Sequence, residues 1–398
     1  MTLITLVLFS NKAFIMWQIF IRFLTLGLIS FGGPAAHIGY FRQLFVQELN
    51  WLDDKRYASF VALSQFMPGP SSSQVGFAIG YHKGGLLGAL MAFIGFTLPS
   101  FMLMFLLAVT SAHWLENVQV AGAIHGLKLL ALVVVAHATM GMFQQFCQRK
   151  TAQIIMLATA VILLIFPFML AQLLVLLIAA MLGTVLLTRG ADTQVEQSPI
   201  ALNYSWLLLF IIGLLSSFYF INHHDSLVQM FAQFYQVGSL VFGGGHVVLP
   251  LLQANVGELV SPDRFLTGYA LAQAIPGPMF TLATFLGADI WLESPILGAL
   301  VATLAIFIPG FLLMLVGLKS WHAISERPTI AGAIAGVNAA VVGLLLAALY
   351  QPVFTTAVLT PLDMALVLLG FGMLKIFKPS IVLLVLGFSL VGAVMTFL

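Results

Sequence analysis

Long apolar stretches, separated by short polar connections, run through the whole chain. A helix needs about 17 to 25 mostly apolar residues to cross a bilayer. The pattern predicts an all-α polytopic membrane protein of about 10–13 transmembrane helices, since two pairs of segments are each short enough to form one bent helix. The predicted segments are 14–33, 57–80, 85–110, 121–146, 152–167, 169–187, 204–221, 227–248, 265–290, 295–317, 330–350, 362–376 and 379–398.

A repeat divides the chain into two related halves. Residues 27–33 read GLISFGG and 238–244 read GSLVFGG, while 65–70 read QFMPGP and 273–278 read QAIPGP. Internal similarity that keeps its register in this way indicates a duplicated structural unit. The predicted units are a first repeat at 14–187, a linker with one extra transmembrane helix at 188–226, and a second repeat at 227–398.

The two repeats are predicted to have opposite orientations in the membrane. Seven predicted segments, an odd number, separate equivalent points of the two halves. Each crossing reverses the chain direction, so the second copy is upside down relative to the first. Inverted-topology repeats with broken helices are an architecture of secondary transporters.

Basic residues give a second test of the segment count, because cytoplasmic loops collect Lys and Arg. If every segment crosses, ten basic residues fall on one side and three on the other. If the two segments with a Pro-Gly-Pro motif fold back without crossing, the split is five against eight. The crossing arrangement is therefore preferred, with the N-terminus in the cytoplasm and the C-terminus outside. Its three exceptions are Arg42, Lys55 and Arg56.

Composition supports a membrane location and excludes several function classes. The chain is 61% hydrophobic and 7% charged, with mean hydropathy +1.09, whereas soluble domains carry about 25% charged residues. The lipid bilayer of the inner (plasma) membrane is the expected environment, and a net charge of +2 gives no reason to expect nucleic acid as a partner. A single cysteine, Cys147, leaves no disulfide framework and no CxxC pair. We expect no metal and no cofactor. A homodimer and the choice between Met1 and Met16 as the start are left open.

Four glycine- and proline-rich motifs are the candidate binding site. Pro and Gly break a helix, and broken backbone at membrane depth is tolerated only where it is buried in protein or lines a wet cavity. A half-helix that starts after such a break presents free amides and a positive dipole end, which suit an anion. The alternative is that the motifs are only kinks and packing sites. The candidate residues are Gly32, Gly33, Pro34, His37, Gln65, Pro68, Gly69, Pro70, Ser71, Ser72 and Ser73, with Gly243, Gly244, Gly245, His246, Gln273, Pro276, Gly277, Pro278 and Thr281 in the second half.

Two cations lie inside apolar segments, where charge is costly and marks function by default. Arg22 and Lys128 are predicted to attract an anionic substrate into the membrane. The alternative for Arg22 is that it extends to the cytoplasmic interface. Histidines inside the segments are either proton carriers or packing residues.

The motifs resemble those of one transporter family. The stretches FLTLGLISFGGPAAHIGYFRQLFV, ALSQFMPGPSSSQVGFAIGYHKGG and FYQVGSLVFGGGHVVLPLL are similar to the chromate ion transporter family in its long, two-domain form. The resemblance covers nearly the whole chain and implies two homologous halves that export chromate, with sulfate as the related oxyanion. Gly245 departs from the family pattern, since it stands where the first half has Pro34.

We expect a transporter driven by membrane potential or a proton gradient, without catalytic residues. The chain has no HExxH motif and no GxxxxGK[ST] loop, so neither a metalloprotease nor direct use of ATP is indicated. A passive anion channel and a carrier for sulfate or molybdate remain as alternatives.

Overall fold

The computed structural model describes residues 3–114, 117–188, 203–221, 226–242, 245–319, 321 and 327–397. These residues form helices and connections, with no strand among them. Six helices are long and apolar enough to cross a membrane, and four shorter apolar helices accompany them among the described residues. The prediction of an all-α, multi-pass membrane protein is confirmed.

The first helix ends at the Gly-Gly-Pro motif, and the chain then turns back along it. Helix α1 (Leu3–Ile29) is followed by α2 (Gly33–Phe41) and the π-helical η1 (Arg42–Glu48). Positive φ angles at Gly32 (100°) and Gly33 (73°) permit the reversal, because glycine adopts them without steric cost. The Phe23 ring on α1 packs on the Phe45 ring of η1 at 4.7 Å. The motif is therefore the tip of a helical hairpin.

The first Pro-Gly-Pro motif forms the tip of a second hairpin. It joins α3 (Asp54–Phe66) to α4 (Ser71–Trp114), and α4 itself turns sharply at Gly84 and Gly85. Arg56 Nη1, in the first turn of α3, lies 3.4 Å from the ring nitrogens of His82, just before that turn. Both open ends of the hairpin consequently lie on the same face.

The second half repeats these hairpins. Around its Pro-Gly-Pro tip, Arg264 Nε lies 2.9 Å from Asp289 Oδ1, so the open ends again meet. Gly287 backs onto the Gly298 carbonyl oxygen, as Gly80 does onto that of Gly88. The elements are α9 (Leu227–Leu240), η2 (Gly245–Val247), α10 (Val248–Val256), α11 (Pro262–Ala274), η3 (Met279–Thr281), α12 (Leu282–Ile290) and α13 (Pro295–Gly317).

The expectation that 57–80 and 265–290 each cross the membrane is therefore wrong. Each of these stretches is a re-entrant hairpin of two short helices. Hydropathy misses the return, because both arms are apolar and their summed length equals that of one spanning helix.

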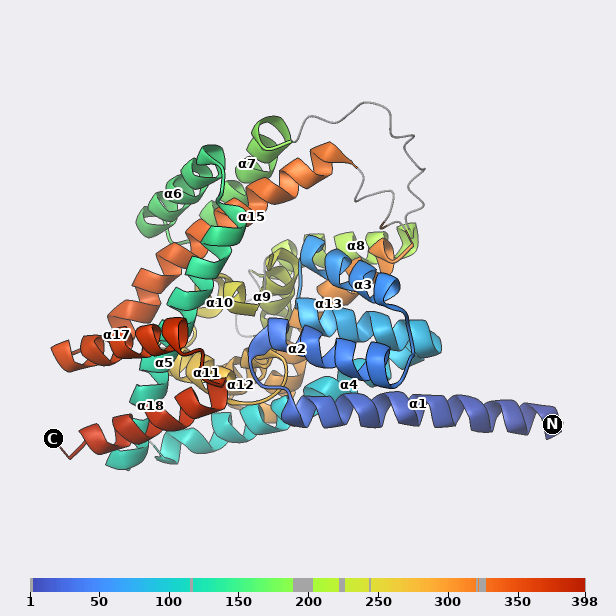
Figure 1. The fold of residues 1–398 in the computed structure, drawn as a ribbon, viewed down its shortest axis with the longest axis horizontal. Helices are drawn as coiled ribbons and strands as arrows, with labels where there is room; N and C mark the ends of the chain where they lie inside the picture. Colours follow the sequence, from blue (N-terminus) through green and yellow to red (C-terminus); the bar gives the residue numbers. More distant parts are fainter. Residues whose placement is uncertain are drawn as a thin grey trace.

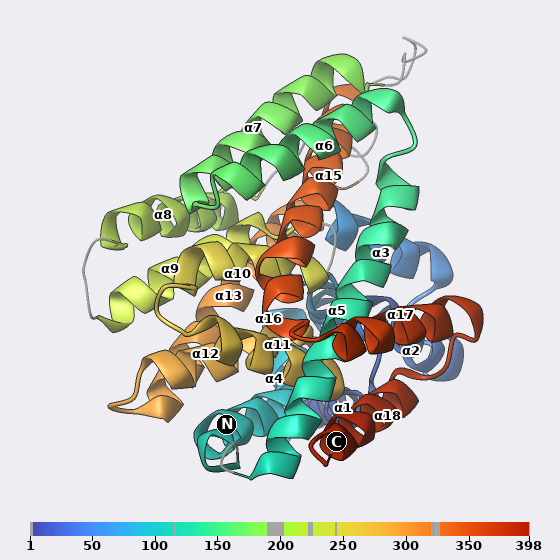
Figure 2. The same ribbon diagram turned by 90° about the vertical axis from the view of Figure 1, so that its left-hand side faces the viewer.

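The remaining helices interlock the two halves. Helix α5 (Val118–Phe146) packs on α17 (Pro361–Ile376) and α18 (Ile381–Met395) of the second half. Reciprocally, α15 (Pro328–Ala348) packs on α6 (Lys150–Ile165) and α7 (Met169–Leu186) of the first half. Figure 2 shows both groups, with α6 and α7 alongside α15 and with α17 and α18 beside α5. Short connections η4 (Leu349–Phe354) and α16 (Thr355–Ala357) follow α15, and α8 (Tyr204–Phe220) packs on α9.

Glycines set the close approach at both interlocked interfaces. The Cα of Gly126 on α5 faces the Phe388 carbonyl oxygen, and that of the equivalent Gly336 on α15 faces the Ala179 carbonyl oxygen, with no room for a Cβ in either place. Arg149 Nη1 before α6 donates to the Leu187 carbonyl after α7 at 3.3 Å, so these helices are antiparallel and not one bent helix.

The hairpins also redistribute the charges. The open ends of the first-half hairpins lie on one face of the molecule, and those of the second-half hairpins lie on the opposite face. The two termini lie at opposite ends of the molecule (Figure 1). One face, here called the basic face, carries Lys12, Arg42, Lys55, Arg56, Lys83, Arg149, Lys150, Lys319 and Arg327. Among the described residues, Arg264 is the one basic residue on the other face. Arg22 and Lys128 lie within helices, Lys375 and Lys378 lie at the turn between α17 and α18, and Arg189 falls outside the described residues.

This asymmetry is sharper than either split expected from the sequence. It predicts that the basic face is cytoplasmic. Five helices, the long part of α4 and then α5, α6, α7 and α8, cross between equivalent points, so the repeat is still inverted.

Cysteine labelling tests the hairpins. Lys55→Cys and Lys83→Cys should react with an impermeant maleimide from the same face, and Leu292→Cys, between α12 and α13, from the opposite face. Burial raises the pKa of the native Cys147 thiol to about 11, so its background reaction is slow. Labelling of Lys55→Cys and Lys83→Cys from opposite faces would restore the crossing arrangement.

Candidate functional site

The hairpin tips of the two halves meet at one centre. The Gly69 amide donates to the Val241 carbonyl at 2.7 Å, and the Gly277 amide donates to the Ser30 carbonyl at 2.9 Å. Val241 and Ser30 occupy equivalent positions, two residues ahead of the glycine pair in each repeat. Each Pro-Gly-Pro tip is thus held by the broken first helix of the other half.

Only glycine suits the middle of each tip. Gly69 has φ +127° and Gly277 has φ +98°, conformations that L side chains rarely adopt. A Cβ on Gly69 would lie 2.8 Å from Gly310 Cα, and one on Gly277 would lie 2.8 Å from Ser100 Oγ. The tips therefore pack against equivalent places on the long helices α13 and α4.

A cavity of about 190 Å³ lies beside the first Pro-Gly-Pro tip. We call it the Ser71 cavity, because Ser71 begins α4 there. The first amides of a helix have no partner within it, and the dipole adds partial positive charge at that end. Its lining consists of Pro34, Ala35, Ile38, Ser64, Gln65, Gly69, Ser71, Gln145 and Phe146.

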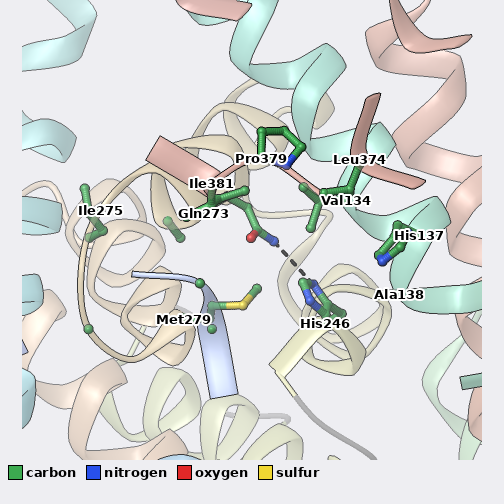
Figure 3. Close-up of a pocket in the computed structure, with 14 residues that line it drawn as sticks. Val134, His137, Ala138, His246, Gln273, Ile275, Met279, Leu374, Pro379 and Ile381 are labelled. Carbon is green, nitrogen blue, oxygen red and sulfur yellow. Dashed lines mark hydrogen bonds between the residues drawn. The ribbon is translucent and has the colours of Figure 1, made fainter. Parts of the chain in front are cut away.

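A second cavity, of about 260 Å³, lies beside the second tip. We call it the Gln273 cavity, and Figure 3 shows Gln273 and His246 in contact inside it, with His137 nearby. The Nδ1 of His246 lies 3.3 Å from Gln273 Nε2 and 3.2 Å from the Tyr269 hydroxyl. Gln273, His246 and Tyr269 therefore form one cluster of polar side chains beside this cavity.

The two cavities are related by the repeat. Gln65 and Gly69 line the first, and their equivalents Gln273 and Gly277 line the second. The residues between them, Gly32 to Ala35, contribute to both, and α5 closes both with a single helical stripe. That stripe consists of Val134, His137 and Ala138 in the Gln273 cavity and Gln145 and Phe146 in the Ser71 cavity.

The sequence-predicted residues therefore fall into clear groups. Gly32, Gly33, His246, Gln273 and Gly277 line the Gln273 cavity, while Pro34, Gln65, Gly69 and Ser71 line the Ser71 cavity. Pro68, Pro70, Pro276 and Pro278 flank the tip glycines, and the Thr281 hydroxyl donates to the Pro278 carbonyl at 2.7 Å. A Cβ on Gly245 would lie 3.2 Å from Pro34 Cγ and from Met279 Sδ. Gly243 and Gly244 lie outside the described residues.

Two of the predicted residues hold the tip and do not line a cavity. The fully buried His37 lies 3.2 Å from the Ser72 hydroxyl and 3.2 Å from the Ser30 carbonyl oxygen. It thereby bridges α2 to α4 beside the cross-tip bond of Ser30. Ser73 is also buried, and its hydroxyl has no hydrogen-bond partner among the described residues.

Neither predicted cation lines either cavity. Lys128 is 6% exposed, and its Nζ donates to Asp263 Oδ1 at 2.5 Å, in the first turn of α11. Arg22 lies in an exposed groove between α1 and η1, beside Tyr40 and Glu48. Hydropathy places a charge in a segment but does not show which side of the helix it occupies.

Sequence reasoning missed the contribution of α5 to the site. Gln145 carries no motif and sits near the end of an ordinary apolar helix. His137 is one of the histidines inside the apolar segments, and its Nδ1 is buried without a hydrogen-bond partner among the described residues. Their helical spacing from Val134 is the one sequence signal, and it has meaning only once the cavities are known.

An inverted repeat whose broken helices meet at paired cavities is an architecture of membrane transporters. The family model described as Chromate transporter matches residues 17–184 and 228–393. The chain therefore belongs to the chromate transporter family, and its members are transporters and not enzymes.

Curated relatives match over most of their length. An uncharacterized transporter of Methanocaldococcus jannaschii is 27% identical over 83% of this chain and 82% of its own. The chromate transport protein of Pseudomonas aeruginosa is 27% identical over 82% of this chain and 79% of its own. That of Cupriavidus metallidurans is 26% identical over 95% and 92%. No solved structure matches the chain.

Alanine at the tip glycines tests the centre. Gly69→Ala and Gly277→Ala should each lower the free energy of unfolding by about 1–3 kcal/mol, the typical cost of a strained backbone conformation, measured as a lower melting temperature in detergent. Gly372→Ala is the matched control, since a Cβ there meets nothing within 4 Å. Equal melting temperatures for the tip variants and the control would contradict the tip packing.

Proposed function

We propose that this protein exports a tetrahedral oxyanion dianion, chromate or its analogue sulfate, from the cytoplasm across the inner membrane. The anion binds in the Ser71 cavity, between the first turn of α4 and the start of α2. The backbone amides of those turns, the Ser71 hydroxyl and the Gln65 side chain donate to its oxygens.

One observation carries this proposal: two helix N-termini and an amide side chain converge on one cavity. Pro34, Ala35, Gln65 and Ser71 come from three helices and all line the Ser71 cavity. Helix N-termini bind anions through free amides and dipole charge. Transporters of inverted-repeat architecture place such half-helices at their substrate sites.

Among the described residues, no Lys or Arg lines either cavity, which suits release as well as binding. A buried ion pair with the substrate would have to be broken at every cycle, whereas neutral donors hold the anion by hydrogen bonds, each worth about 1.5–3 kcal/mol net when the acceptor is charged. The Gln273 cavity supplies a second set of donors, Gln273 and His246, past the shared Gly32 to Ala35 segment. The anion passes from the Ser71 cavity to the Gln273 cavity along α5.

The membrane potential drives export. Moving one charge through 100 mV is worth about 2.3 kcal/mol, so a dianion leaving a negative interior gains about 4.6 kcal/mol. That is close to a thousandfold concentration ratio, since 1.4 kcal/mol is tenfold. Proton exchange through His246 or His137 is the alternative drive, and a carrier for sulfate alone is the alternative substrate.

Relaxing the tip tests the anion site. Pro68 and Pro70 have fixed φ angles on either side of Gly69, so Pro68→Ala with Pro70→Ala should loosen the tip and disperse the amides that face the Ser71 cavity. Chromate flux should fall at least tenfold while membrane expression stays near normal. Ser72→Ala should have a smaller effect, because its hydroxyl contacts His37 and not the cavity. The control is Pro295→Ala at the first turn of α13, where proline has no special role.

The equivalent change in the second half tests whether the two cavities contribute equally to chromate transport. Pro276→Ala with Pro278→Ala should reduce flux less, because Met279 stands there in place of Ser71 and Gly245 in place of Pro34. If the Pro68/Pro70 variant is expressed and still transports chromate at the normal rate, the proposed anion site is wrong and the prolines serve only to shape the chain.

Voltage dependence tests the drive. In proteoliposomes loaded with chromate, an inside-negative potassium diffusion potential should speed chromate exit, while a pH gradient alone should not. Flux that depends on the pH gradient and not on voltage would contradict the electrogenic mechanism and support proton exchange.

A further inference from the structure

A third cavity, of about 360 Å³, lies on the basic face between α3 and the end of α13. We call it the interfacial cavity. One part of its lining is charged and polar, and the other is apolar. The whole lining consists of Asp53, Lys55, Arg56, Ser59, Phe60, Leu63, Leu318, Lys319 and Trp321. The neighbouring residues Ser64 and Gln65 of α3 face the Ser71 cavity instead, so α3 separates the two.

Comparison with the equivalent place in the second half shows an excess of positive charge here. Arg264, the equivalent of Arg56, is neutralised by Asp289 at 2.9 Å and also donates to Ser111 Oγ and the Ala108 carbonyl, both at 2.6 Å. Arg56 has the neutral His82 at the corresponding position. Lys55 likewise replaces Asp263. Two acidic positions of the α11–α12 hairpin, Asp263 and Asp289, are thus basic or neutral in the α3–α4 hairpin.

Among the described residues, the cations of the interfacial cavity have no ion-pair partner: no carboxylate pairs with Lys55, Arg56 or Lys319. Asp53 lines the cavity, but its Oδ1 caps α3 by accepting the Arg56 backbone amide at 2.7 Å. Three cations and one carboxylate leave the lining with a net positive charge that an anionic group would balance.

The apolar part of the lining selects the kind of anion. Phe60, Leu63 and Leu318 face the cavity, and Trp321 packs edge-on against Phe66 at 5.3 Å. A small hydrated anion would gain nothing from these groups. A phospholipid presents a phosphate next to apolar chains, and Trp is enriched at the depth where the two meet. Basic pockets on the cytoplasmic side of membrane helices bind such head groups.

We propose that the interfacial cavity binds the head-group phosphate of an anionic phospholipid of the cytoplasmic leaflet, with Lys55, Arg56 and Lys319 on the phosphate and Trp321 and Phe60 on the start of its acyl chains. This site is separate from the transport cavities. A lipid bound there bridges α3 to the end of α13 and so stabilises the folded protein.

The test is a lipid titration of the full chain in detergent micelles, followed by melting temperature. Phosphatidylglycerol should raise the melting temperature, and phosphatidylcholine and inorganic phosphate should not. Lys55→Gln with Lys319→Gln should weaken the apparent phosphatidylglycerol affinity about thirtyfold, from roughly 1 kcal/mol per basic residue near a lipid surface. Both side chains are exposed, so the variant should fold.

Two controls keep the result specific. Lys150→Gln removes an exposed charge from the same face outside the cavity and should leave the affinity unchanged. Arg56→Lys keeps the charge and should retain most of the shift. An equal shift with inorganic phosphate would make this a free-anion site, and an equal shift in the Lys55/Lys319 variant would show that the lipid binds elsewhere. Either result overturns the proposal.

Discussion

The two reciprocal hydrogen bonds between hairpin tips, Gly69 to Val241 and Gly277 to Ser30, are the constraint on which the structure depends. Backbone groups at membrane depth cannot turn to water, so each broken helix must find partners in protein. Neither half can satisfy its own Pro-Gly-Pro tip, because the acceptor belongs to the first helix of the other half. The break that opens helix N-termini to an anion therefore also requires the inverted partner.

The helices away from the centre also pack against the opposite half. Helix α5 of the first half lies against α17 and α18, and α15 of the second half lies against α6 and α7. These exchanged contacts pack glycine against backbone, so the helices approach closely, while α5 turns its remaining stripe toward the two cavities. The hairpins and the exchanged helices thus form two groups that meet along the Ser71 and Gln273 cavities.

The sequence predicts those parts of this arrangement that rest on single residue types. Proline and glycine mark the breaks at Pro68 to Pro70 and at Pro276 to Pro278, and the repeat pairs them correctly. It does not predict that each break reverses the chain, because both arms of a hairpin are as apolar as one spanning helix. Nor does it place Lys128 or Arg22, whose roles depend on which side of a helix they occupy. Gln145 was missed because its part in the site exists only once α5 lies across the tips.

The central claim is that the dianion binds at the first-turn amides of α4. Selenate has the charge and tetrahedral shape of chromate and sulfate, and its selenium scatters anomalously, so crystals of the protein grown with selenate would locate it directly. The account predicts an anomalous peak in the Ser71 cavity, within hydrogen-bond reach of the Ser71 amide and the Gln65 side chain. A peak beside Arg22 or Lys128, with none in the Ser71 cavity, would contradict it.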